Sequence, residues 1–310
     1  MRQSSAHFLM VRPTNFRMNE ETAKDNLFQE TNLSLPKASV EAEKEFDRFV
    51  KELRDKGIKV MVDQFPSDID APDALFPNNW VSFHEDGKVG LYPMLTSNRR
   101  VERRESVLDR VQNEFGLEIK EVIDFTEFEE HDKFLEGTGS LVLDRKHRVA
   151  YACLSERTDK QAVTHFCEQM NYRPVMFRAF HAVDGTNHPI YHTNVMMCIA
   201  SAFVLICLDS ITDETERQSV VDAILATDRE IIELTADQMN NFAGNALEVT
   251  NEEGLLYLVL SERALNSLDQ NQVDRINRHL KIIAPNLATI EKLGGGSARC
   301  MMCEVFLPKF

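Results

Sequence analysis

The stretch WVSFHEDGKVGLYPM, residues 80–94, places two β-rich runs on either side of the polar turn Asp86-Gly87. Alternating apolar runs separated by Asp-Gly are typical of a β-hairpin. The same shape recurs in SLVLDRKHRVAYACL (140–154), VMMCIASAFVLICL (195–208) and ALEVTNEEGLLYLVLS (246–261). We therefore predict four hairpins of similar length, and a fifth in which residues 303–308 pair with residues 7–13 from the opposite end of the chain.

A helix and then a single strand are expected after each hairpin. In residues 39–58 the apolar side chains recur mostly every three or four positions, which indicates one face of a helix with Ser39 as its N-cap. That predicted face comprises Val40, Ala42, Phe46, Phe49, Val50 and Leu53. The predicted single strands are residues 59–64, 121–126, 174–180, 230–235 and 281–285. The chain is therefore expected to be an α/β protein, and with no Pro/Gly/Ser-rich linker, residues 1–310 form one domain of five modules.

Composition and charge narrow the possible partners. The 310 residues carry a formal net charge of −15, which repels phosphate backbones and anionic lipid heads, so neither nucleic acid nor membrane is expected to bind. We find neither an apolar run of signal-peptide length nor the roughly 18 apolar residues that span a bilayer, and expect a cytoplasmic protein. Five of the six cysteines are expected to be structural thiols, and residues 19–39 are expected to form a surface loop or lid.

A short polar motif precedes each hairpin and supplies one chemically unusual residue. These residues are Asn79, Glu136, His192, Asn245 and Cys300, at separations of 57, 56, 53 and 55. If the five modules surround a pseudo-fivefold axis, the five side chains converge on one spot. A cysteine, a histidine and a carboxylate meeting there would form a nucleophilic site.

The motifs that carry these residues resemble those of the pentein superfamily, which includes arginine deiminases, dimethylarginine dimethylaminohydrolases and amidinotransferases. The similarity runs through APDALFPNNW (71–80), LEGTGSLVLD (135–144), YHTNV (191–195) and GGGSARCMMC (294–303), and the form FPNNW is similar to a branch described as citrulline-utilisation hydrolases. The resemblance implies a five-bladed β/α propeller and a cysteine hydrolase with Cys300 as nucleophile, His192 as general acid and base, and Glu136 as its partner.

The resemblance also implies substrate-binding positions. Segments 96–105 and 154–159 resemble those whose arginines hold a substrate carboxylate, which points to Arg157 and to Arg99, although the sequence does not decide between Arg99 and Arg100. Asn78, Asn79 and Asn194 stand where related enzymes commonly have acidic or basic residues. Fewer charges favour a neutral ureido compound such as citrulline over a guanidinium, while Asp73 keeps an acid within reach of an arginine-like substrate. The full predicted binding set is Asp73, Asn78, Asn79, Arg99, Arg157, Asn194 and Asn245.

Two alternatives remain open at this point. An amidinotransferase would share the covalent intermediate and pass the group to an amine, and a non-enzymatic pentein would only bind a partner. The Cys-x-x-Cys pair at residues 300 and 303 lacks two further ligands at zinc-site spacing, so no metal is expected. No organic cofactor is expected either, and a homo-oligomer is possible.

Overall fold

Five three-stranded sheets share one connectivity in the computed structural model, which describes residues 2–26, 28–29, 35–183 and 186–310. In each sheet two strands form an antiparallel pair, and the third strand runs parallel to the second. The five sheets are β3(Val81–Phe83)-β4(Lys88–Leu91)-β5(Glu121–Asp124), β6(Leu141–Asp144)-β7(Val149–Cys153)-β8(Arg173–Phe177), β11(Met197–Ile199)-β12(Phe203–Ile206)-β13(Glu230–Glu233), β14(Leu247–Thr250)-β15(Leu256–Val259)-β16(Lys281–Ile283) and β17(Cys303–Glu304)-β1(His7–Arg12)-β2(Lys59–Gln64). The four internal hairpins are confirmed, each within its predicted residues.

The fifth sheet joins the two ends of the chain, as predicted. Phe8 pairs with Glu304 and Leu9 with Cys303 in an antiparallel ladder, and β1 then pairs in parallel with β2. Strand β17 is much shorter than the predicted residues 303–308. The predicted strand 174–180 is wrong at its end, since β8 stops at Phe177 and the chain then forms a separate hairpin of β9(Phe180–Val183) and β10(Thr186–Pro189).

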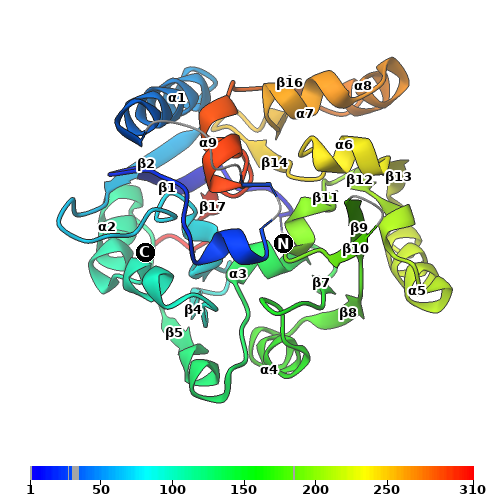
Figure 1. The fold of residues 1–310 in the computed structure, drawn as a ribbon, viewed down its shortest axis with the longest axis horizontal. Helices are drawn as coiled ribbons and strands as arrows, with labels where there is room; N and C mark the ends of the chain where they lie inside the picture. Colours follow the sequence, from blue (N-terminus) through cyan, green and yellow to red (C-terminus); the bar gives the residue numbers. More distant parts are fainter. Residues whose placement is uncertain (1, 27, 30–34, 184–185) are drawn as a thin grey trace.

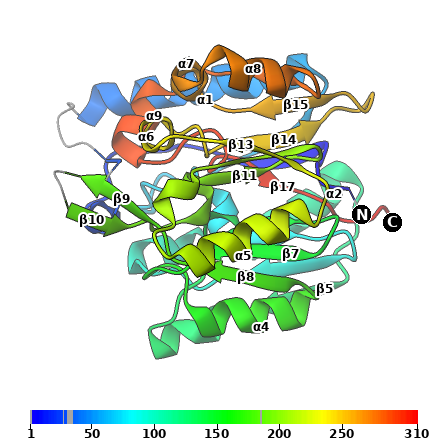
Figure 2. The same cartoon turned by 90° about the vertical axis from the view of Figure 1, so that its right-hand side faces the viewer.

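Helices connect the second and third strands of each sheet and lie on the outside. Figure 1 shows them around the rim of the molecule in chain order, with the strands toward the middle. Figure 2 shows both chain ends at one side and the β9–β10 hairpin at the other. The α-helices are α1(Leu35–Asp55), α2(Glu105–Phe115), α3(Gly137–Ser140), α4(Lys160–Met170), α5(Glu214–Leu225), α6(Ala236–Asn240), α7(Glu262–Ser267), α8(Gln270–Asn277) and α9(Ala288–Gly294), and the short 3-10 helices are η1(Thr22–Lys24), η2(Pro77–Asn79), η3(Ser97–Glu102), η4(Thr126–His131), η5(Thr193–Val195) and η6(Leu208–Ser210). Within these described ranges no helix has the length and apolar character to cross a membrane.

Helix α1 packs its predicted apolar face into the core with one exception. Val40 is 53% exposed, because it precedes Ala42 by two positions and so lies about 200° around the helix from it. The predicted N-cap at Ser39 is also wrong, since the helix begins at Leu35 and Ser39 lies inside it. Pro36, the second helical residue, is compatible with this early start because the first N–H groups of a helix have no intrahelical acceptor.

Candidate active site

The five predicted site residues lie in the connections that lead into the five sheets. Asn79 ends η2, Glu136 and His192 immediately precede α3 and η5, and Asn245 and Cys300 lie just before β14 and β17. All five are at most 7% exposed. The structure brings these connections together at the middle of the molecule, where each contacts the next. A side chain at Gly137 would lie 2.3 Å from the Asn78 carbonyl oxygen, which shows how closely two of the connections approach.

Glu136 and His192 form a buried hydrogen-bonded pair. His192 Nε2 lies 2.8 Å from Glu136 Oε2, and the Leu95 amide donates to Glu136 Oε1 at 3.1 Å. Burial raises the pKa of Glu136, but Arg157, His192 and Arg99 outweigh burial and lower it below its ordinary value. Burial lowers the pKa of His192 despite the opposing effect of Glu136. The pair therefore combines an ionised Glu136 carboxylate with a His192 imidazole that is neutral at neutral pH. Because Nε2 of His192 is hydrogen-bonded to Glu136, Nδ1 is the ring nitrogen left for other contacts.

Two asparagine amides donate to the Cys300 sulfur. Asn245 Nδ2 lies 3.1 Å from Cys300 Sγ and Asn194 Nδ2 lies 3.5 Å from it. These two contacts hold the sulfur in a defined position within the site. Gly295, at φ 61°, ends α9 in the left-handed region that glycine tolerates, and so allows the chain to turn toward Cys300. Within the described part of the chain, the hydrogen bonds to this sulfur come from these two side chains.

Cys303 differs from Cys300 in its surroundings. Its thiol donates to the Val81 carbonyl at 3.4 Å, and burial raises its pKa to about 12. All six cysteines lie in the described ranges and are free and buried. Within those ranges no group of three or more His, Cys, Asp or Glu side chains is arranged to hold a metal ion.

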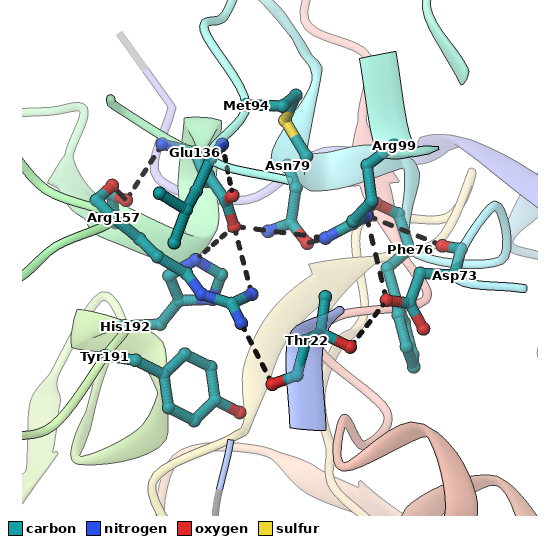
Figure 3. Close-up of polar contacts among 12 residues, drawn as sticks. Thr22, Asp73, Phe76, Asn79, Met94, Arg99, Glu136, Arg157, Tyr191 and His192 are labelled. Atoms are coloured by element: carbon teal, nitrogen blue, oxygen red, sulfur yellow. Dashed lines mark hydrogen bonds and ion pairs between the residues drawn. The ribbon is translucent and has the colours of Figure 1, made fainter. Parts of the chain in front are cut away.

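Arg99, rather than Arg100, faces the site. The Arg99 guanidinium is buried and donates to Glu102 at 2.8 and 2.9 Å. It also donates to Asn79 Oδ1 at 2.9 Å (Figure 3). Arg100 instead contacts Glu129 at 3.3 Å and is about one third exposed. Burial raises the pKa of Glu102 to about 7, although Arg99 acts to lower it. We did not predict Glu102, yet its position three residues after Arg99 in a helical turn is the spacing at which an ion pair forms.

Arg157 lies on the side of Glu136 away from Arg99, and all three of its guanidinium nitrogens contact other groups of the protein. Its Nη1 lies 3.4 Å from Glu136 Oε2, its Nε donates to Asp25 Oδ2 at 2.6 Å, and its Nη2 contacts Asp25 and the Thr22 carbonyl. The guanidinium also lies over the Tyr191 ring, 5.1 Å from its centroid. The donors that we predicted to hold a substrate carboxylate therefore hold a carboxylate of the chain itself.

Asp25 belongs to the segment predicted as a surface loop or lid, residues 19–39. Residues 27 and 30–34 of that segment lie outside the described residues, and the helix α1 takes up its last part. The prediction of a surface loop is wrong for Asn19, Thr22 and Asn26, which are buried. Asn19 and Thr22 donate to Asp73 Oδ2 at 2.8 and 3.1 Å, and Asn26 donates to the Gly295 carbonyl at 3.3 Å. This part of the chain covers the site.

A small cavity of about 20 Å³ lies between these groups. Its lining includes Cys300, His192, Asn79, Asp73, Arg99, Arg157, Thr22, Asn26, Phe76, Tyr191 and the three glycines 294–296. Larger cavities lie elsewhere in the molecule and include neither Cys300 nor His192. Several polar atoms around Cys300 have no hydrogen-bond partner within the described part of the chain: Asp73 Oδ1, Asn79 Nδ2, Asn194 Oδ1 and both side-chain polar atoms of Asn78. Asn78 itself does not line the cavity. Asp73 and Asn79 thus offer an unused acceptor and an unused donor to a ligand.

Solved structures with the same fold come from pentein hydrolases. The apo structure of ArgZ, an arginine dihydrolase from Cyanobacteria, superposes with a TM-score of 0.72 at 18% identity, covering 98% of this chain and 41% of that one. Unliganded AgrE gives a TM-score of 0.73 at 16% identity, covering 98% and 40%. A histidine-to-glycine variant of dimethylarginine dimethylaminohydrolase with an S-methyl-L-thiocitrulline adduct gives 0.62 at 12% identity, covering 96% and 99%. This chain thus spans about two fifths of the length of ArgZ and of AgrE.

Comparison with curated proteins finds no match. A family model described as N,N dimethylarginine dimethylhydrolase, eukaryotic, matches residues 12–307, nearly the whole chain. That span includes all five site residues and every strand except β1, of which it contains only Arg12. The chain therefore belongs to the N,N dimethylarginine dimethylhydrolase family.

Proposed function

We propose that this protein is a cysteine hydrolase that breaks a C–N bond at the guanidino or ureido carbon of a small arginine- or citrulline-like amino acid. The observation that carries the proposal is the arrangement around one cavity of Cys300, whose sulfur accepts two amide hydrogen bonds, and His192, which is paired with Glu136. Membership of the family supports it, as do the names of the structural neighbours, an arginine dihydrolase and a dimethylarginine dimethylaminohydrolase.

The proposed reaction proceeds through a covalent intermediate. His192 Nδ1 accepts the Cys300 proton, the thiolate attacks the substrate carbon, and the resulting tetrahedral adduct expels an amine that takes the proton back from Nδ1. In the second half, water gives a proton to His192 as it attacks the same carbon, the C–S bond breaks, and the sulfur recovers the proton. Glu136 holds the imidazole by Nε2 and stabilises the imidazolium that forms in each half. These steps need no metal and no organic cofactor.

The polar atoms that line the cavity without a partner in the described part of the chain indicate which functional group of a substrate would fit there. Asn79 Nδ2 is a buried donor with no partner within the described residues, and a ureido oxygen accepts a hydrogen bond whereas a guanidinium does not. This donor favours a citrulline-like group. Asp73 Oδ1 has no hydrogen-bond partner among the residues that the structure describes, and it suits an ammonium or a guanidinium, so an arginine-like substrate stays within the proposal.

We assign the α-carboxylate of the substrate to Arg157. A guanidinium binds a carboxylate in bidentate fashion, and Arg157 holds Asp25 in that way in the ligand-free site. The substrate would take the place of Asp25. We assign Asn194 and Asn245 to holding the Cys300 sulfur, which both contact, rather than the substrate. Asn78 is assigned to supporting its neighbour Asn79.

The proposal extends to the architecture that creates the site. We infer a single five-bladed β/α propeller over residues 1–310, with pseudo-fivefold symmetry. The shared connectivity of the five sheets, their order around the molecule in Figure 1 and the pairing of β17 with β1 support this description.

The test is a panel of arginine, methylated arginines, citrulline and agmatine, with release of ammonia, amine or urea followed for each. The wild type should turn over at least one member, Cys300→Ser should be inactive, and Cys303→Ala should remain active as the matched control. Turnover that survives Cys300→Ser would refute the mechanism. No turnover of any member would favour the binding-protein alternative, and product formation only when an amine acceptor is added would favour the amidinotransferase.

A further inference from the structure

Arg99 and Glu102 form a buried ion pair beside the proposed catalytic groups. Both side chains are at most 3% exposed. Arg99 Nε and Nη2 donate to the two Glu102 carboxylate oxygens at 2.8 and 2.9 Å, a bidentate geometry that fixes the plane of the guanidinium. The Asp73 and Phe76 carbonyls, both 3.4 Å from Nη2, accept from the other side of the same nitrogen. The edge of the guanidinium formed by Nε and Nη2 is therefore already occupied by Glu102. It is not free to bind a substrate carboxylate, which is the role that we predicted for Arg99.

The opposite edge of Arg99 faces Asn79. Arg99 Nη1 donates to Asn79 Oδ1 at 2.9 Å. Because a guanidinium has donors only, the amide atom that faces it must be the oxygen, and this settles which way the Asn79 amide is turned. The Nδ2 group then points away from Arg99 toward His192. A methyl group at Gly139 would lie 2.4 Å from Asn79 Nδ2 and 2.8 Å from His192 Nδ1.

We propose that Glu102 is a positioning residue that holds Arg99 in place so that Asn79 presents its Nδ2 donor to the reacting group. Without Glu102, the Arg99 charge has two other carboxylates within reach, since Asp73 Oδ2 and Glu136 Oε2 each lie 3.9 Å from it. Rotation toward either one would release the Asn79 oxygen. The amide would then be free to turn its oxygen into the cavity, where it repels a ureido oxygen.

The kinetic test uses Glu102→Gln and rests on the proposed function. A glutamine keeps the shape but presents an NH₂ group to Arg99, so kcat/KM for the best substrate of the panel should fall about 10- to 100-fold. Glu129→Gln is the matched control, because Glu129 pairs with Arg100 and Arg103 away from the cavity, and it should stay within about 2-fold of wild type.

A double-mutant cycle separates positioning from a general structural effect. If Glu102 acts through Asn79, Glu102→Gln should cause no further loss of kcat/KM in an Asn79→Ala background. The same fold loss in both backgrounds would overturn the proposal. If Glu102→Gln does not fold, Glu102→Asp keeps the charge on a side chain one methylene shorter, and its smaller loss should likewise vanish in the Asn79→Ala background.

A structural test does not depend on turnover. In a crystal structure of Glu102→Gln, or of Glu102→Asp, the contact between Arg99 Nη1 and Asn79 Oδ1 should be lost, while the Arg103–Glu129 pair should be unchanged. Retention of the Arg99–Asn79 contact would overturn the positioning role. If the wild type turned over no substrate of the panel, that result would count against the proposed function alone. The crystal structures of the Glu102 variants would still show whether Glu102 positions Arg99.

Discussion

Replacing Glu136 with glutamine tests how strongly the buried charges of the site depend on one another. Glu136 Oε2 lies 2.8 Å from His192 Nε2, 3.4 Å from Arg157 Nη1 and 3.9 Å from Arg99 Nη1, and the side chain is fully buried. Glutamine has nearly the same shape, so the substitution removes the negative charge with little change in packing. The buried positive charges of Arg99 and Arg157 then lose one of the carboxylates that balance them.

The expected cost follows from that geometry. Removing one partner of a buried ion pair costs about 3–5 kcal/mol. Arg157 keeps Asp25 and Arg99 keeps Glu102, so we expect the lower end, about 3 kcal/mol, or more than about 100-fold in the unfolding equilibrium constant. Turnover should fall as well, by about 100- to 10,000-fold, because the imidazole loses the partner that holds it and stabilises its charged form.

Urea unfolding measures the first effect. Glu41→Gln is the control, since Glu41 pairs with Lys44 and Arg48 on the exposed face of α1 and should change the unfolding free energy by less than about 0.5 kcal/mol. Interactions with Arg157, His192 and Arg99 lower the folded-state pKa of Glu136 below its ordinary value of 4.5. Its contribution is therefore present above about pH 4.5 and is lost as the pH falls further. The gap between wild type and Glu136→Gln should narrow on acidification. A loss of less than about 1 kcal/mol at pH 7, or a gap that widens in acid, would refute the reasoning.

Three further predictions follow from single contacts. Iodoacetamide should modify Cys300 before the other cysteines, because Cys300 lines the cavity whereas burial raises the pKa of Cys303 to about 12; equal labelling of the two by mass spectrometry would contradict this. Gly139→Ala should lower kcat about 100-fold, because its methyl group would lie 2.8 Å from His192 Nδ1 and displace the ring; an unchanged kcat would contradict it. Glu45→Ala should cost about 1–2 kcal/mol in urea unfolding, because Glu45 accepts hydrogen bonds from the backbone amides at the start of α9; an unchanged unfolding free energy would contradict it.

The repeating order of the strands was predictable from local patterns. Alternation of apolar residues around short polar turns predicts each internal hairpin, and the predicted strand 59–64 matches β2 residue for residue. The convergence of five distant residues was predictable because equal spacing implies equivalent positions in repeated units. The ends of the elements were less predictable. Helix α1 begins four residues before the expected N-cap at Ser39, and a proline in the first turn is compatible with this start although side-chain capping preferences do not indicate it.

The contacts of the arginines were not predictable from the sequence. The arginine segments indicated carboxylate binding, and both arginines do bind carboxylates, but these belong to Glu102 and Asp25 of the same chain. Asp25 lies in a polar, charged stretch whose composition is that of a surface loop, and nothing in its local pattern indicates that it packs over residues more than 100 positions away. Such long-range pairings follow from how the five units are arranged in space.

The central claim is that the Cys300 sulfur bonds covalently to the substrate carbon. Wild-type protein should be mixed with the best substrate of the panel, quenched in acid and digested with trypsin, which releases residues 300–309 as one peptide. Because this peptide contains both Cys300 and Cys303, a Cys303→Ala variant assigns the adduct to one sulfur. We predict an adduct on Cys300 that forms in both wild type and Cys303→Ala and is absent in Cys300→Ser. Turnover without any adduct on Cys300, and undiminished in Cys300→Ser, would contradict the claim.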